Sequence, residues 1–173
     1  ERYIVDIGAA RVASSPEEFD VIVLGGGAAG LMAALTAGQR GKRVLVLEVS
    51  NKLGKKILMS GGGRCNFTNL EINANHFICE NPHFVKSALA QYTQWDFISL
   101  VATHGVPYHE KDHGQLFCDK SAKDILKILI DECHKADVDL RLNCEVGRIE
   151  YRDTYKVSSN QGGFSAPSLI VAT

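Results

Sequence analysis

Two glycine-rich stretches carry most of the residues that could do chemistry in this sequence. The first reads GGGAAG at residues 25–30, and the second reads SGGGRCNFTN at residues 60–69. Glycine loses more backbone freedom on folding than any other residue, so runs of it persist where the backbone turns sharply or approaches a ligand closely. Each stretch therefore predicts a place where the backbone itself shapes a binding site.

The first stretch lies inside a strand–helix–strand pattern. The β-branched run DVIVL precedes it, the helix-spaced segment LMAALTAGQRGK follows, and RVLVLE then predicts a second buried strand. About thirty residues is the size of a parallel crossover unit. The glycines Gly25, Gly27 and Gly30 form G-x-G-x-x-G, in which the first allows the tight turn, the second lets a pyrophosphate approach, and the third packs the helix on the strand. The pattern predicts a dinucleotide site at a helix N-terminus.

Glu48 ends the second predicted strand. A carboxylate at that position can accept hydrogen bonds from ribose hydroxyls, and it would repel a 2′-phosphate. Glu48 therefore favours FAD or NAD over NADP in this site.

The second stretch admits several interpretations. A metal site is disfavoured because the stretch has one thiol and no CxxC or paired histidine nearby. A second phosphate loop would need a helical pattern behind it, and none follows. A pliable wall along a flat cofactor fits better, because glycines allow close approach and Arg64 supplies a fixed cation. The same arginine could lower the pKa of Cys65, although a disulfide-reducing enzyme would need a closely spaced partner thiol.

His109, Glu110 and His113 suggest zinc at first sight, but Gly114 interrupts the stretch, so a structural or substrate-side surface is favoured and no metal is expected. The number of cysteines is odd, which favours reduced thiols over a disulfide framework. The five are Cys65, Cys79, Cys118, Cys133 and Cys144.

The composition is that of an ordinary globular protein, with 173 residues, 45% of them hydrophobic, and a formal net charge of −1. This charge does not suggest an overall attraction to nucleic acid or membrane, and no apolar run approaches the roughly 18 residues of a membrane span. We therefore expect a small-molecule substrate, no nucleic-acid partner and no membrane partner, and the odd number of cysteines favours a cytoplasmic location. The oligomeric state is not predicted.

The remaining chain completes an α/β pattern. Helices are predicted at 83–92, 95–105 and 122–136, with a capping box formed by Thr93 and Asp96. Short extended segments are expected at 106–110 and 114–118, and a strand at 138–142. The segments EVGRIEY, YKVSS and FSAPSLIVAT predict a small antiparallel meander that returns to a parallel central sheet. Residues 1–19 are an unassigned N-terminal extension, in which SSPEEF looks like a linker with a helix-start signature.

Several segments together resemble one family. They are DVIVLGGGAAGLMAAL, VLVLE, GKKILMSGGGRCNFTN, NPHF, WDF, HGVPYHEKDHGQLFC and LIVAT. They resemble the BaiN/RdsA-type NAD(P)/FAD-dependent oxidoreductases, also described as aminoacetone oxidase-like flavoproteins, of the glutathione-reductase-like FAD-binding superfamily. The resemblance implies a Rossmann-like FAD-binding domain at 20–173 that is incomplete at its C-terminal end. The chain would then be an N-terminal fragment of a longer two-domain flavoprotein.

The resemblance also implies roles for individual residues. Around the FAD pyrophosphate would lie Gly25, Gly27, Ala28, Ala29 and Gly30, and Glu48 would hold the adenosine ribose. Towards the flavin would lie Lys56, Arg64, Cys65, Asn66 and Thr68. Val146 would meet the adenine through its backbone, and Ala172 and Thr173 would pass the middle of the cofactor. The resemblance identifies no catalytic acid or base.

The expected activity is that of an FAD-dependent oxidoreductase. NAD(P)H would be the co-substrate that reduces the flavin, which would pass hydride to an organic substrate. Two alternatives stay open: a flavin-binding fragment without turnover, and an FAD-dependent nucleic-acid-modifying enzyme of the same superfamily.

Overall fold

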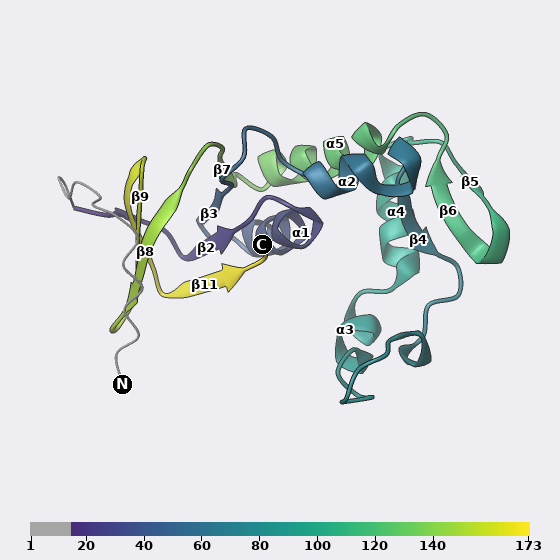
Figure 1. The fold of residues 1–173 in the computed structure, drawn as a ribbon, viewed down its shortest axis with the longest axis horizontal. Helices are drawn as coiled ribbons and strands as arrows, with labels where there is room; N and C mark the ends of the chain where they lie inside the picture. The colour runs from purple at the N-terminus through teal and green to yellow at the C-terminus, as the bar shows by residue number, and fades with distance from the viewer. Residues whose placement is uncertain (1–14) are drawn as a thin grey trace. The chain divides into compact units, whose positions relative to one another are not determined.

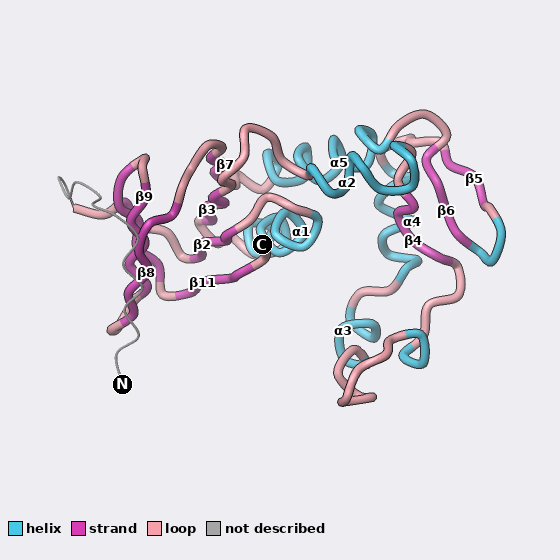
Figure 2. The backbone as a smooth tube through the Cα atoms, viewed as in Figure 1, coloured by secondary structure: helices cyan, strands magenta, loops and turns pink. Residues whose placement is uncertain are grey.

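A computed structural model describes residues 15–173, which divide into two compact units (Figures 1 and 2). The described part of the first unit consists of residues 15–55 and 129–173, and the second unit is Lys56–Ile128. Most of the unassigned N-terminal extension, residues 1–14, lies outside the described residues.

The first unit contains a parallel sheet with the strand order β11-β2-β3-β7. Its strands are β11 (Ser168–Val171), β2 (Val21–Leu24), β3 (Val44–Leu47) and β7 (Asp139–Arg141). Every residue of β2 and β3 is buried, as both faces of a covered parallel sheet require. Helix α1 (Ala28–Gln39) packs on β2 and β3. The predicted parallel central sheet and its crossover helix are confirmed.

A second sheet of the same unit has the order β1-β10-β9-β8. It consists of β1 (Glu17–Glu18), β10 (Gly162–Ala166), β9 (Tyr155–Ser159) and β8 (Val146–Tyr151). The last three strands form the predicted antiparallel meander.

The predicted return to the central sheet is confirmed, because the chain leaves the second sheet at Pro167 and enters the central sheet as β11. Proline has no N–H to donate to a ladder, so a strand breaks readily there. The expected linker at 14–19 also contains strand β1, which pairs in parallel with β10.

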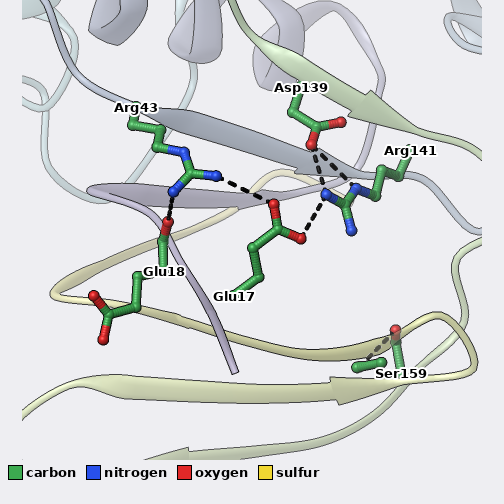
Figure 3. A network of polar contacts seen from close by, with 7 residues as sticks. Glu17, Glu18, Arg43, Asp139, Arg141 and Ser159 are labelled. Atoms are coloured by element: carbon green, nitrogen blue, oxygen red, sulfur yellow. Dashed lines mark hydrogen bonds and ion pairs between the residues drawn. The ribbon is translucent and has the colours of Figure 1, made fainter. Parts of the chain in front are cut away.

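Glu17 on β1 holds a network of charged side chains in this unit (Figure 3). Its carboxylate accepts from Arg43 Nη2 at 3.2 Å and from Arg141 Nη2 at 2.8 Å. Arg141 also donates to Asp139 at 2.7 Å and lies 4.9 Å from the centre of the Phe164 ring. The hydrogen bond to Asp139 raises the pKa of the Arg141 guanidinium despite partial burial. Because every one of these side chains is at least partly exposed to solvent, each pair contributes about 1 kcal/mol or less.

The second unit contains the antiparallel sheet β4-β6-β5, formed by β4 (Asn66–Asn69), β6 (Gln115–Cys118) and β5 (Tyr108–Glu110). Its helices include α3 (Lys86–Gln91) and α4 (Gln94–Thr103), with the 3-10 turns η1 (Ser60–Gly63), η2 (Ala74–His76) and η3 (Asp112–Gly114). The Thr93–Asp96 capping box is present as predicted.

Two helices cross the boundary in sequence between the units, namely α2 (Lys55–Met59) and α5 (Ala122–Lys135). Among residues 15–173, no helix is both long enough and apolar enough to cross a membrane.

Candidate functional site

The glycine motif leaves no room for a side chain at Gly25, in the loop between β2 and α1, or at Gly30, in the first turn of α1. A Cβ on Gly25, where φ is +104°, would lie 2.6 Å from the Ala172 carbonyl oxygen. A Cβ on Gly30 would lie 1.9 Å from the carbonyl oxygen of Gly25. The turn and the close packing of α1 therefore both require glycine, as the motif predicts.

Gly27 differs from these two glycines, because a Cβ there would meet no atom within 4 Å. It is the N-cap of α1, and no side chain caps that end of the helix. The first turn also holds no acidic residue, and Ala28 and Ala29 are exposed. The free N–H groups of the helix start thus face open space, where an anion such as a pyrophosphate can be bound.

Glu48 is held against this loop by hydrogen bonds. Its Oε2 accepts from the Gly26 N–H at 2.7 Å, while Oε1 accepts from the Ser50 N–H at 2.8 Å and from the Ser50 hydroxyl. Burial raises the pKa of the carboxyl, but these hydrogen bonds outweigh it and hold the pKa below its usual 4.5. Glu48 is therefore an anion at neutral pH, and its carboxylate has lone-pair capacity left for a ribose hydroxyl.

Gly26 and Ser50 hold the Glu48 carboxylate in place, and the sequence prediction missed both. A Cβ on Gly26 would lie 2.3 Å from Leu53 Cδ2, so only glycine brings its N–H to Glu48 without a shift. The available sign for Gly26 was that it is the middle one of three consecutive glycines and that the G-x-G-x-x-G pattern does not require it. For Ser50 the sign was a hydroxyl two residues after the acid.

Residues from other strands of the first unit lie at the same loop. The Ala172 N–H donates to the Leu24 carbonyl at 2.8 Å, which places the end of β11 beside Gly25. The Cys144 N–H donates to the Glu48 carbonyl at 3.0 Å, two residues before β8 begins at Val146. Gly25, Glu48 and Ala172 are thus brought together, while the expected contacts of Val146 and Thr173 with a cofactor stay predictions.

The second glycine stretch forms a tightly wound turn. Gly61, Gly62 and Gly63 all have positive φ, at +55°, +64° and +87°, and Cys65 follows at +54°. A Cβ on Gly61 would lie 2.7 Å from both the Asn66 nitrogen and Phe117 Cε1. Positive φ favours glycine at all three positions, and Gly61 also leaves no room for a side chain. The expected wall along a cofactor stays a prediction.

The candidate side chains in and around this turn, from α2 to β4, differ in exposure. Lys56, Arg64 and Asn66 are exposed, Thr68 is half-buried, and Cys65 is only 6% exposed. Burial raises the pKa of the Cys65 thiol although Ser60 hydrogen-bonds to it, and the lowering that Arg64 could have caused is not found.

Cys118 on β6 is a neighbouring thiol that sequence spacing did not reveal. Burial, followed by the charge that Cys65 would carry, raises its pKa to about 12. Both thiols are therefore protonated at neutral pH, which disfavours a nucleophilic role.

The histidine stretch at 109–113 is structural in part. His109 Nδ1 lies 2.7 Å from Asp119 Oδ1, and its ring stacks on Phe117 with centroids 6.4 Å apart. Within residues 15–173, no three His, Cys, Asp or Glu side chains gather in a way that could hold a metal ion.

Comparison with known proteins gives one family and several relatives. Residues 19–173 match the family described as "HI0933-like protein Rossmann domain". The chain is 50% identical over 158 residues to the ribosomal RNA dihydrouridine synthase of Escherichia coli K12, covering 91% of the chain and 40% of that protein. It is also 50% identical over 159 residues to the Haemophilus influenzae protein of the same name, covering 88% of the chain and 39% of that protein. A third relative is the 3-dehydro-bile acid delta(4,6)-reductase of Clostridium scindens, at 32% identity over 120 residues. The alignment covers 67% of the chain and 29% of that protein.

Solved structures with low sequence identity share the fold. The 3-ketosteroid-delta4-(5alpha)-dehydrogenase of Rhodococcus jostii RHA1 aligns with a TM-score of 0.65 at 15% identity, covering 98% of the chain and 48% of that structure. Glycine oxidase from Geobacillus kaustophilus aligns with a TM-score of 0.58 at 16% identity, covering 91% of the chain and 55% of that structure. The fold is the Rossmann-like fold of FAD-binding oxidoreductases, and the chain spans about two fifths of the dihydrouridine synthases it matches.

One expectation is contradicted by these relatives. We expected no nucleic-acid partner, yet the two relatives at 50% identity are named for acting on ribosomal RNA. The expectation rested on a net charge of −1, and a sum over the whole chain does not report the chemistry of a local surface.

Proposed function

The chain belongs to the HI0933-like protein family, and we propose that it is the FAD-binding part of an enzyme that reduces uridine in ribosomal RNA. The observation that carries the proposal is the 50% identity over 91% of the chain to a ribosomal RNA dihydrouridine synthase. We further propose that residues 20–173 act as one FAD-binding domain.

The loop geometry supports the cofactor half of this proposal. The open N-terminus of α1 at Gly27 would hold the pyrophosphate, and the anionic Glu48 would hold the adenosine ribose. Bound FAD supplies a ring that can transfer hydride to the substrate. We propose the segment Arg64, Cys65 and Asn66, which follows η1, as a contributor at the flavin end, together with Lys56 on α2 and Thr68 on β4.

The relatives are also named for reducing the same type of bond in their substrates. Uridine becomes dihydrouridine when two hydrogens add across a carbon–carbon double bond conjugated with a carbonyl. The bile acid relative is likewise named for reduction at such positions in a 3-oxo compound. A conjugated double bond accepts hydride at one carbon and a proton at the other, so this chemistry suits a flavin. We propose NAD(P)H as the source of the hydride.

The experiment starts with the purified protein and its visible spectrum. NADH or NADPH is added in the absence of oxygen, and unmodified ribosomal RNA is added next. The RNA is then digested, and the masses of its nucleosides are measured by mass spectrometry. The proposal predicts a flavin spectrum that bleaches, and a uridine that gains the mass of two hydrogen atoms.

Three other outcomes would contradict the proposal at different steps. A colourless protein that cannot be reconstituted with FAD contradicts the cofactor assignment. Flavin that binds but is never reduced by NADH, NADPH or dithionite indicates a binding module without turnover. Flavin that is reduced, but is reoxidised by a conjugated 3-oxosteroid and not by RNA, favours a small organic substrate.

A further inference from the structure

The second unit contains an open pocket that none of the cofactor assignments uses. Its volume is about 400 Å³, within the size range of small-molecule sites. Six residues line it: Asn69, Glu71, Ile72, His76, Phe77 and His113. They come from the end of β4, the segment that follows it, turn η2 and turn η3.

A single amide fixes two sides of this pocket. The Asn69 Nδ2 donates to the His113 carbonyl at 2.7 Å, and the Asn69 Oδ1 accepts from the Glu71 N–H at 2.8 Å. A Cβ on Gly114 would lie 3.0 Å from that same Oδ1, so the chain passes close to the amide. On the third side, His76 Nε2 lies 3.3 Å from Asn73 Nδ2. The pocket is therefore shaped by hydrogen bonds within the unit and does not depend on a ligand for its walls.

The side chains left over for a ligand are of two kinds. Phe77 is 43% exposed and offers a flat apolar ring, with Ile72 beside it in the lining. Within the part of the chain that the structure describes, Glu71 and His113 form hydrogen bonds only through their backbone, so the carboxylate and the imidazole can both bind a ligand. Glu71 accepts hydrogen bonds, whereas the two imidazoles can donate them.

This combination matches the chemistry of a nucleobase. Single-stranded RNA is recognised by stacking unpaired bases on aromatic rings and by hydrogen bonds to their edges. The pairing edge of uracil carries one N–H between two carbonyl oxygens. One carboxylate acceptor and two imidazole donors can satisfy all three of these groups.

We propose that this pocket binds a uracil base of single-stranded RNA, stacked on Phe77 and read by Glu71 with His76 and His113. The inference rests on the proposed function, since the RNA-acting relatives supply the reason to expect RNA. It adds a location on this chain and a preference for uracil over the other bases.

The first test measures binding of fluorescein-labelled oligouridine by fluorescence anisotropy. Phe77→Ala removes the stacking ring and should weaken binding about tenfold. Phe84→Ala is the matched control, because Phe84 is an aromatic residue of the same unit, is 75% exposed and lies outside the pocket. Equal binding by wild type and Phe77→Ala would overturn the inference, as would an equal loss in both variants.

The second test addresses the choice of base. Glu71→Gln keeps the size of the side chain but replaces a pure acceptor, so the preference for oligouridine over oligocytidine should fall several-fold. An unchanged preference, or a wild type without one, would overturn the uracil assignment.

Flavin absorbance and circular dichroism, recorded on every variant, separate lost binding from lost folding. If wild type binds no RNA although it carries flavin, the proposed function falls and the inference falls with it. If wild type binds and reduces RNA while the variants behave like it, only the pocket assignment is overturned.

Discussion

At the scale of single residues, Gly27 permits the sharpest test of the cofactor assignment. A methyl group at this position would point into open space, and its φ of −83° is one that alanine adopts readily. Gly27→Ala should therefore leave the melting temperature of the FAD-free protein unchanged. The same methyl would occupy the space that a pyrophosphate needs, so FAD affinity should fall at least about tenfold, or roughly 1.4 kcal/mol. Titration of the FAD-free protein with FAD, followed by fluorescence, measures the change.

The matched control for this change is Gly163→Ala. Gly163 lies in β10 of the same unit, away from the loop, and its nearest atoms are 3.8 Å away on Pro16. The control should alter neither stability nor FAD affinity. Undiminished FAD binding by Gly27→Ala would place the pyrophosphate somewhere other than the start of α1.

Glu48 links the same loop to pH. Its pKa in the folded chain lies below 4.5 because Ser50 and Gly26 donate to the ionised form, so folding favours the anion. A lowered pKa contributes stability that is fully present above the unfolded value and is lost as the pH falls through the folded value. The melting temperature of wild type should thus exceed that of Glu48→Gln near neutral pH, and the difference should shrink below pH 4.5.

Thermal melts of the FAD-free proteins between about pH 7 and about pH 3 test this expectation. A difference that stays constant down to the acid end would mean that Glu48 stabilises the loop by shape and not by charge. Ser50→Ala removes one donor and should reduce the pH dependence without abolishing it.

At the scale of elements, the turn η1 tests whether the second glycine run is structural. Gly61 and Gly105 both have positive φ, but a Cβ on Gly61 meets two atoms at 2.7 Å while one on Gly105 meets nothing. Gly105→Ala should cost about 1–2 kcal/mol of unfolding free energy from backbone strain alone. Gly61→Ala adds a steric clash and should cost about 2–4 kcal/mol. Urea unfolding measures both, and equal costs would show that the turn relieves the contacts of Gly61 at little cost.

The elements also show how far the sequence could predict the structure. Apolar runs such as VIVL and VLVL predict buried parallel strands directly, and Thr93 with Asp96 predicts the start of α4, because both depend on local chemistry. Strand β1 was missed, since two glutamates carry no strand pattern and its pairing with β10 joins distant parts of the chain.

The candidate site also contains some features that local sequence predicts and others that only distant strand pairing determines. The glycine motif and Glu48 follow from sequence spacing, whereas the buried state of Cys65 and its proximity to Cys118 depend on the pairing of β4 with β6. A register between strands some fifty residues apart is set by packing, and a single sequence carries little information about it.

At the scale of the whole molecule, the charge balance constrains how this chain could bind RNA. It has 19 basic and 20 acidic residues, so it offers no overall basic field. Proteins that bind nucleic acid mainly through phosphates neutralise several of them and lose affinity steeply as salt rises. The local surface points the same way, because the residues that line the pocket at Phe77 include no lysine or arginine, so binding there would depend more on stacking and on hydrogen bonds to base edges.

This difference predicts a shallow salt dependence. Raising NaCl from roughly 50 mM to roughly 200 mM should weaken oligouridine binding by the chain less than about tenfold, against roughly 10³–10⁵ for a protein that contacts six to ten phosphates. Phe77→Ala should lower the affinity at every salt concentration and leave the slope unchanged, because the ring carries no charge. A steep slope in wild type would show that phosphate contacts dominate, and Arg64, an exposed cation of the second unit, would then be the first residue to neutralise, as Arg64→Gln.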